Sequence, residues 1–296
     1  MTAKPGPYRN GSDQLSVADR RRIADFVTRE TGIQLPESKH QLVEVRLRKR
    51  QRALGLPSIK HYVNYALDNS AQNNERGHLF DALTTNKTQF YREANHFTLL
   101  RQYVEQGMQS VDDVITHSDG YGDSELAVWS AGCSTGQEAY TLAFELMELQ
   151  QGNSDFHFSI AASDISSRCL EHAARATYKH QEAEQIPLAL RKKYLLRSKG
   201  GEVDRVRMAP EVTRHVRFFN FNLLRGNYSA WTAHYDVIFC RNVMIYFSHE
   251  DRAKIVAKLA SCLKPGGLLF VGHSESIVDV GKSLSRLQPA VYRKRQ

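Results

Sequence analysis

A single acidic residue beside a glycine-rich loop is the feature of this sequence with the clearest chemical meaning. Residues 125–143 read ELAVWSAGCSTGQEAYTLA, which begins like a buried strand and turns tightly at Gly132 and Gly136. The residues after Gly136 are typical of a helix, so Glu138 falls in the first helical turn. A strand, a glycine loop and a helix in this order open a doubly wound α/β sheet, which binds ligands at the carboxyl ends of its strands.

The charge of Glu138 indicates which ligand this loop takes. A helix N-terminus attracts phosphate groups, and a carboxylate there would repel the pyrophosphate of a dinucleotide such as NAD. The same carboxylate would attract an ammonium group, which S-adenosylmethionine carries at its amino-acid end. Thr135-Gly136-Gln137-Glu138 also has the form of a capping box, in which Glu138 binds the amide of the cap residue. This stretch alone leaves a methyltransferase and a plain helix cap as alternatives.

The elements that would position Glu138 alternate between strand and helix. The sequence predicts three further strands, at residues 156–162, 235–240 and 268–271. Ser166 and Ser248 each precede a helical pattern. Strands interleaved with helices indicate a mostly parallel, Rossmann-like sheet. Residues 178–219 differ, because they are basic and place Gly200-Gly201 between two short strand-like runs, and we predict that they form an inserted antiparallel β lobe.

The first part of the chain reads as a small helical bundle. Residues 1–12 are polar and contain proline and glycine, so we predict that they are disordered. Capping residues and apolar periodicity then predict four helices, which begin near Ser16, Glu37, Ser58 and Glu75. We therefore divide the chain into a helical N-terminal domain at 1–83, a linker at 84–97 and an α/β domain at 98–296.

Positive charge is concentrated in this helical part. The formal net charge is +8 with a pI of about 9.3, and residues 1–80 hold 14 Lys and Arg against 8 Asp and Glu. The helix that begins near Glu37 carries five basic residues on the faces away from its apolar stripe: Arg46, Arg48, Lys49, Arg50 and Arg52. A basic surface of this kind favours either nucleic acid or an acidic protein partner; a solvated helix face is the plain alternative.

Composition argues for a cytoplasmic protein. With 41% hydrophobic residues the chain can bury a substantial core, yet it has no run of about 18 apolar residues that would insert into a membrane. Its first residues lack the apolar segment of a signal peptide. The four cysteines are widely spaced without a C-x-x-C pair, so we expect neither a zinc site nor a disulfide framework.

Three further stretches are long and unusual enough to identify a family. They are TTNKTQFYREANHF at 84–97, FFNFNLL at 218–224 and CRNVMIYF at 240–247. Together with WSAGCSTGQEAY, and in the same order, they closely resemble the chemotaxis receptor methyltransferases of the CheR family. The resemblance runs from about Gly32 to the C-terminus.

The resemblance implies an enzyme that transfers a methyl group from S-adenosylmethionine to glutamate side chains of chemoreceptors, without a metal. It also implies a helical N-terminal domain, a linker and a Rossmann-like domain with a small antiparallel insertion. By resemblance, the cofactor-binding residues are Asn86, Thr88, Arg92, Glu138, Asp164, Asn222, Leu223, Arg241 and Asn242. Within this set the resemblance gives Glu138 the methionine amino group, Asp164 the ribose hydroxyls, and the last four residues the adenosine side. Arg92 and Tyr246 would face the reacting carbons and are the catalytic candidates.

Several of these assignments have a structural alternative. Arg241 and Asn242 directly follow a strand and could simply satisfy the backbone groups of their own loop. Asp164 lies 32 positions after Gly132 rather than the usual ~20 for a ribose-binding acid, and it could instead cap the helix at Ser166. Arg92 could form a surface pair on a helix that also carries His96, with Glu93 or Glu75 as partner. Tyr246 could be a core aromatic residue whose hydroxyl reaches the surface.

Partners follow from the same reading. The basic helix would attract the glutamate-rich methylation helices of the receptors, and the inserted lobe would suit a receptor C-terminal peptide added as a strand. The chief alternative is a nucleic-acid methyltransferase, because of the high pI. Enzymes that methylate base amines usually carry an Asn/Asp-Pro-Pro motif to hold a flipped base, whereas this sequence has Arg241-Asn242-Val243-Met244. A non-catalytic S-adenosylmethionine-binding regulator and an NAD oxidoreductase are weaker alternatives.

Overall fold

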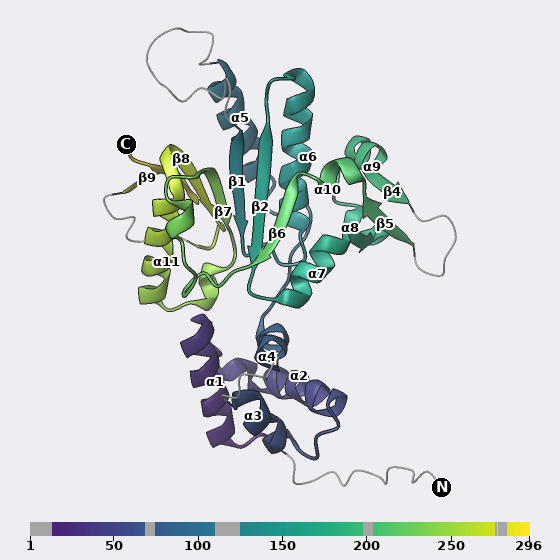
Figure 1. Cartoon of the computed structure of the whole chain (residues 1–296), viewed down its shortest axis with the longest axis vertical. Helices are drawn as coiled ribbons and strands as arrows, with labels where there is room; N and C mark the ends of the chain where they lie inside the picture. The colour runs from purple at the N-terminus through teal and green to yellow at the C-terminus, as the bar shows by residue number, and fades with distance from the viewer. Residues whose placement is uncertain (1–13, 69–74, 110–124, 198–203, 276, 278–282) are drawn as a thin grey trace. The chain divides into compact units, whose positions relative to one another are not determined.

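The chain folds into two units, each with its own core. The computed structural model describes residues 14–68, 75–109, 125–197, 204–275, 277 and 283–296, and the chain divides into compact units at 1–84 and 85–296 (Figure 1). In the described part of the chain, no helix is both long and apolar enough to cross a membrane.

The first unit is the predicted helical bundle. Its elements are α1 (Val17–Thr31), the 3₁₀ turn η1 (Glu37–Lys39), α2 (His40–Ala53), α3 (Ile59–Leu67) and α4 (Glu75–Leu83). Ser16 and Ser58 cap α1 and α3 by accepting backbone amides, and Gly32 ends α1 in the left-handed conformation that glycine favours. The apolar stripe of each helix is buried in one shared core, to which α2 contributes Val43 and Leu47.

The second unit is built on a seven-stranded sheet with the order β6-β2-β1-β7-β8-β10-β9. The strands are β1 (Leu126–Ala131), β2 (Phe158–Asp164), β6 (Val216–Asn220), β7 (Tyr235–Cys240), β8 (Leu263–Val271), β9 (Leu284–Gln288) and β10 (Val291–Lys294). The first five strands in the spatial order are parallel, and β10 runs antiparallel to both of its neighbours. The Rossmann-like arrangement predicted from the sequence is therefore confirmed.

Helices cover this sheet and complete its core. They are α5 (Asn95–Gln109), α6 (Gln137–Gly152), α7 (Ser167–Arg175) and α11 (His249–Cys262). Leu126 and Val128 of β1 share a core with residues of α5 and α6 (Figure 1). Trp129 directly follows Val128 in the strand, so its side chain points to the opposite face of the sheet. Within the described residues, the β6–β7 connection contains only a short 3₁₀ turn, η2 (Ser229–Trp231).

Aromatic side chains pack around Trp129 on that opposite face. Five rings lie within 6.5 Å of the Trp129 ring, measured between centroids, and belong to Phe219, Phe221, Tyr228, Trp231 and Tyr235. Four of these five residues come from the end of β6 and from the β6–β7 connection. The aromatic cluster therefore fixes a segment that contains little regular secondary structure.

The inserted lobe has its own small sheet, as predicted, but it ends earlier than 219. Its elements are β3 (Thr177–Lys179), α8 (His180–Ala183), α9 (Leu188–Tyr194), β4 (Leu195–Arg197), β5 (Arg205–Met208) and α10 (Pro210–Thr213). The strands are antiparallel in the order β3-β5-β4. Residues 216–219 belong to β6 in the main sheet, because Val216 to Asn220 pair with Ile160 to Asp164 of β2. The expected turn at Gly200-Gly201 lies outside the described residues.

Several predicted boundaries shift for identifiable reasons. The strand expected at 156–162 is β2, which continues to Asp164 because Ser163 pairs with Ala131 at the end of β1. The segment between α4 and α5 is irregular, so Arg92 precedes α5 and does not share a helix with His96 as the sequence suggested. Tyr91 and Glu93, on either side of Arg92, both have positive φ angles, of 54° and 55°, which bulky side chains seldom adopt.

Candidate active site

The loop after β1 has the shape that its glycines predict. Gly132 and Gly136 have φ angles of 89° and 93°, in the region where only glycine is unstrained. A Cβ atom on Gly132 would lie 2.5 Å from Cγ2 of Val243, which follows β7. The loop therefore packs directly on the segment after β7, and the carboxyl ends of β1, β2 and β7 form one edge of the sheet.

Glu138 points back toward the sheet and does not cap its own helix. The N-cap residue of α6 is Gly136, which makes no side-chain cap hydrogen bond. The two carboxylate oxygens of Glu138 accept the hydroxyl of Ser130 at 2.7 Å and Nε of Arg241 at 2.8 Å. The capping-box alternative is therefore wrong, because both oxygens are directed at the end of β1 and the end of β7.

Arg241 connects the sheet to the segment before α5. Its side chain is only 1% exposed. Besides Glu138, its guanidinium donates to the carbonyl of Arg92 at 2.7 Å and lies 2.9 Å from Nδ1 of His96. It also lies over the rings of Phe97 and Phe239, 5.2 and 5.5 Å from their centroids, where cation–π attraction adds to the ion pair.

These contacts are all with groups of the protein itself, and the adenosine-side role expected for Arg241 stays a prediction. They place its guanidinium between Glu138 and the linker. A buried cation is stable only with a carboxylate and hydrogen-bond acceptors around it, and this position supplies both. The sequence could not indicate this pairing, since Glu138 and Arg241 are 103 positions apart.

Asp164 ends β2 and fixes the glycine loop. Its Oδ2 accepts the amide of Ser134 at 2.8 Å, and its Oδ1 accepts the amide of Ser166 at 2.9 Å. Ser166, rather than Asp164, caps α7 by accepting the amide of Cys169. Asp164 is therefore not the cap of α7, as the alternative proposed; it binds the amide of the residue that is the cap. Asp164 is 9% exposed, and its carboxylate connects the glycine loop to the start of α7.

The linker is fixed to the second unit at several points. The hydroxyl of Ser134 donates to the carbonyl of Asn86 at 3.0 Å, and the hydroxyl of Tyr91 donates to Glu145 at 2.7 Å. Arg92 is half-buried and donates to the carbonyl of Lys87 at 3.0 Å, and Thr88, beside Lys87, is also half-buried.

The surface-pair alternative for Arg92 is not supported. Glu75 was one proposed partner, and its carboxylate binds Arg50 and Tyr62. Glu93 was the other, and it binds Asn242 and His273.

The remaining predicted residues lie in two turns. Asn222 accepts the amides of Leu224 and Arg225 with its side-chain oxygen, and Leu223 is buried. Asn242 has a positive φ of 60° and donates to Glu93 at 3.2 Å. Tyr246 is half-buried and its hydroxyl lies 3.5 Å from the carbonyl of Thr85, so it is not a core residue.

Glu93 and His96 lie beside Arg241, although the sequence suggested them only as members of a surface pair with Arg92. Together with His273 they offer three ligand-type atoms within 4.8 Å of one another. Burial and the charge of Arg241 lower the pKa of His96 to about 4. Burial alone would raise the pKa of Glu93, but the hydrogen bond from Asn242 and the charge of Arg241 lower it. The cationic Arg241 lies 3.8 Å from Glu93, so a guanidinium is the positive charge beside this cluster.

The basic residues of α2 fall into two groups. Arg46 donates to the carbonyls of Ala82 and Thr84, and Arg50 forms two bonds of 2.7 and 2.8 Å to Glu75, which is 3% exposed. Arg48 pairs with Glu44 one turn away. Lys49 and Arg52 are exposed and form no ion pair with any residue that the structure describes. Only part of the predicted basic surface is therefore available to a partner.

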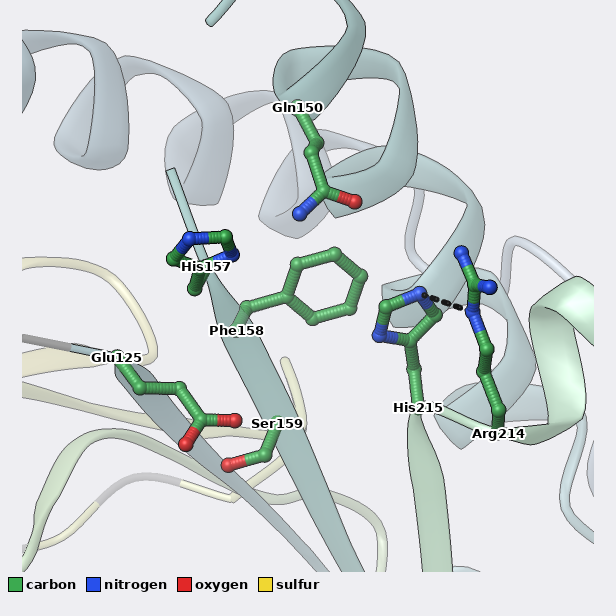
Figure 2. A pocket seen from close by; sticks show the side chains of 7 residues that line it. All are labelled: Glu125, Gln150, His157, Phe158, Ser159, Arg214 and His215. Carbon is green, nitrogen blue, oxygen red and sulfur yellow. Dashed lines mark hydrogen bonds between the residues drawn. The ribbon is translucent and has the colours of Figure 1, made fainter. Parts of the chain in front are cut away.

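A separate cavity lies near the beginning of β2 (Figure 2). It has a volume of about 510 Å³, and its lining residues are Glu125, Gln150, His157, Phe158, Ser159, Arg214 and His215. His215 stacks on Phe158 with ring centroids 4.3 Å apart. None of the predicted site residues lines this cavity, and it lies toward the amino end of β2, away from the glycine loop.

The fold and the site together define a class of enzyme. A parallel sheet with a reversed strand, a glycine loop whose first helical turn is acidic, and an acid at the end of β2 are the features of an S-adenosylmethionine-dependent methyltransferase. Residues 86–292 match the family described as "CheR methyltransferase, SAM binding domain", and residues 18–84 match "CheR methyltransferase, all-alpha domain". The chain belongs to the CheR methyltransferase family.

Relatives of known name agree with this assignment. The chain is 35% identical over 292 residues to "Chemotaxis protein methyltransferase 2" of Pseudomonas aeruginosa, covering 98% of each protein. It is 34% identical over 278 residues to "Chemotaxis protein methyltransferase" of Escherichia coli, covering 94% of this chain and 91% of that protein. A third relative of the same name, from Borreliella burgdorferi, is 34% identical over 283 residues, covering 95% of this chain and 94% of that protein.

Proposed function

We propose that this enzyme transfers a methyl group from S-adenosylmethionine to glutamate side chains on the cytoplasmic helices of chemoreceptors. The products are a glutamate methyl ester and S-adenosylhomocysteine, and the reaction adjusts receptor signalling during chemotaxis. The observation that carries the proposal is the position of Glu138, in the first turn of α6 beside the glycine loop, in a chain that belongs to the CheR methyltransferase family.

The residues at the carboxyl edge of the sheet fit such a ligand. The carboxylate of Glu138 lies in the first turn of α6, and its negative charge disfavours a phosphate at this helix N-terminus. Asp164 ends β2, where an acid is suited to bind ribose hydroxyls, and Asn222 and Leu223 lie in a turn that follows β6 on the same edge. S-adenosylmethionine, when bound, supplies a methyl carbon attached to a positively charged sulfur.

The substrate carboxylate needs no general base. A glutamate side chain has a pKa near 4.3 and is about 99% ionised at pH 7. A carboxylate oxygen forms the new bond to carbon as the carbon–sulfur bond breaks, and the electron pair of that bond remains on sulfur. Charge is therefore consumed in the transition state, and the protein gains rate chiefly by aligning the two groups and excluding water.

Arg92 and Tyr246 are proposed to perform this alignment. Both are half-buried beside the linker, with contacts to the Lys87 and Thr85 carbonyls. We expect Arg92→Ala to lower kcat about 100-fold, because a misplacement of 1 Å can have an effect of that order. Tyr246→Phe removes one hydrogen bond and should lower kcat about tenfold. Steady-state kinetics with saturating receptor fragment would measure both effects, and normal turnover by either variant would remove that residue from its proposed role.

The exposed bases of α2 are proposed to attract the acidic receptor helices. Reversing Arg46 or Arg50 would be a poor test, because Arg50 compensates the buried charge of Glu75 and its loss would destabilise the helical unit. We expect the double reversal of Lys49 and Arg52 to glutamate to raise KM for the receptor fragment about tenfold at low salt and to reduce the salt dependence.

A matched control for this test changes the same charge elsewhere in the unit. Arg21 on α1 and Lys60 on α3 are also exposed, and their double reversal should leave KM within about twofold of the wild type if attraction is local to α2. Equal increases in KM for the two double variants would show that only net charge matters.

The inserted lobe is proposed to bind a receptor C-terminal peptide. Strand β4 has β5 as its neighbour on one side of the small sheet, and Leu196 on β4 is 52% exposed. An extended peptide could pair with this edge and place one side chain on Leu196.

The proposed reaction is tested by the chemistry of the product. The protein would be incubated with S-adenosylmethionine labelled in its methyl group and with receptor cytoplasmic fragments. Carboxyl methyl esters hydrolyse in mild base and release labelled methanol, whereas methyl groups on nitrogen remain attached. We expect release of the label; a base-stable label on the receptor or on nucleic acid would overturn the proposal.

A further inference from the structure

The segment that follows β7 carries several proposed site residues but little regular structure. Residues 241–246 include Arg241, Asn242 and Tyr246, and only the 3₁₀ turn η3 (Met244–Tyr246) is regular. Asn242 is in the left-handed region with a φ of 60°, a conformation that needs support from its surroundings. Something outside the segment must therefore fix its backbone.

That support comes from Glu275, which lies four residues after β8. Its Oε2 accepts the amide of Asn242 at 2.6 Å and the amide of Gly272 at 2.8 Å. Its Oε1 accepts the amide of Ile245 at 3.2 Å, and the amide of Met244 also faces the carboxylate. Glu275 is 5% exposed, so one buried side chain binds backbone amides of two segments that follow neighbouring strands.

The packing around this carboxylate leaves little freedom. A Cβ atom on Gly272 would lie 2.5 Å from Nδ2 and 2.9 Å from the amide nitrogen of Asn242, so the turn after β8 and the segment after β7 are in direct contact. Burial raises the pKa of Glu275, and the four backbone amides act in the opposite direction. An acceptor with two charged oxygens suits four N–H donors, whereas an amide side chain would direct its own N–H groups at some of them.

We infer that Glu275 is a positioning residue for methyl transfer, which holds the segment 241–246 so that Asn242 and Tyr246 meet the cofactor and the substrate carboxylate. The inference rests on the roles proposed for those two residues. It assigns Glu275 no contact with either substrate; it acts only through the backbone that it binds.

The test is the isosteric variant Glu275→Gln, with Asp236→Asn as the control. Asp236 is also a buried carboxylate that accepts a backbone amide, from Ala127 at 2.9 Å, but it lies at the opposite end of β7. We expect Glu275→Gln to lower kcat about tenfold, as one lost charge-assisted hydrogen bond would, and to weaken S-adenosylhomocysteine binding, while KM for the receptor fragment stays within about twofold. Asp236→Asn should leave kcat and the affinity for S-adenosylhomocysteine unchanged.

The double variant Glu275→Gln/Tyr246→Phe tests the role of Glu275 separately from the role of Tyr246. If Glu275 acts through Tyr246, Glu275→Gln should lower kcat much less in a Tyr246→Phe protein than in the wild type. Wild-type kcat and affinity in Glu275→Gln, alongside an impaired Tyr246→Phe, would overturn the inference and leave the proposed role of Tyr246 intact. Normal turnover by Tyr246→Phe alone would instead remove the role of Tyr246. If kcat fell equally in Glu275→Gln and Asp236→Asn, Glu275 would contribute only to the stability of the fold, and the inference would be wrong.

Discussion

Glu138→Gln is expected to weaken the binding of S-adenosylhomocysteine by about 30-fold or more. Removing one partner from a buried, hydrogen-bonded charge pair costs about 2 kcal/mol or more, which corresponds to that ratio of dissociation constants. The glutamine keeps an acceptor for Ser130 but loses the charge that faces Arg241 and the proposed amino group of the ligand. Calorimetric titration of the purified variant would give the dissociation constant directly.

A truncated ligand provides the control for this prediction. Methylthioadenosine has the adenosine and the sulfur but lacks the amino-acid end, so its affinity should change by less than about threefold in Glu138→Gln, as expected for a contact that it does not make. If both ligands were weakened equally, Glu138 would support the shape of the pocket and would not bind the ligand amino group. Binding of NADH as tight as that of S-adenosylhomocysteine would contradict the electrostatic argument as a whole.

Arg241→Ala is expected to destabilise the second unit by about 3–5 kcal/mol and to abolish turnover. The substitution leaves Glu138 without its cation and the Arg92 carbonyl without its donor in a buried environment, and breaking such a pair from one side has effects of this size. The midpoint of thermal unfolding should fall by roughly 6–20 °C for a unit of this length. Arg241→Lys should recover little, because a single ammonium cannot make the separate bonds of the planar guanidinium.

An exposed ion pair of the same length is the matched control. Arg197 lies 2.9 Å from Asp204, compared with 2.8 Å between Arg241 and Glu138, but the two side chains of the exposed pair are 66% and 47% accessible. Arg197→Ala should therefore change stability by about 1 kcal/mol or less. If the two variants unfolded at the same temperature, burial would not explain the importance of Arg241.

Local patterns were sufficient for much of the fold. The range of β7 agrees with the predicted one, because Tyr235–Cys240 is a short, mostly apolar run with a clear end. The basic composition of the inserted lobe predicts the lobe but not where it ends. Strand β6 (Val216–Asn220) follows the lobe directly, without the long crossover helix that usually precedes a parallel strand, so the sequence places it in the lobe. Only the pairing of β6 with β2 places it in the main sheet.

The site was predictable where acidic residues follow strands. Glu138 follows the loop after β1, and this position indicated either a cofactor ligand or a helix cap. Asp164 ends β2, and the family resemblance assigned it the ribose hydroxyls. Glu275 lies four residues after β8 and also accepts backbone amides, so a search for acids shortly after strands could have found it. The partners of Arg241 could not have been predicted, because its buried guanidinium is bound by groups from two distant segments, residues 92–97 and Glu138, and no spacing in the sequence records that geometry.

The aromatic cluster around Trp129 also determines how unfolding will look by fluorescence. The chain has two tryptophans, Trp129 and Trp231, and their rings lie 5.4 Å apart. Tryptophan fluorescence will therefore report unfolding around this one cluster. Unfolding of the helical bundle, which has no tryptophan, will not change the tryptophan signal directly. If the two units lose structure at different temperatures, emission and far-ultraviolet dichroism will give different midpoints for the same sample.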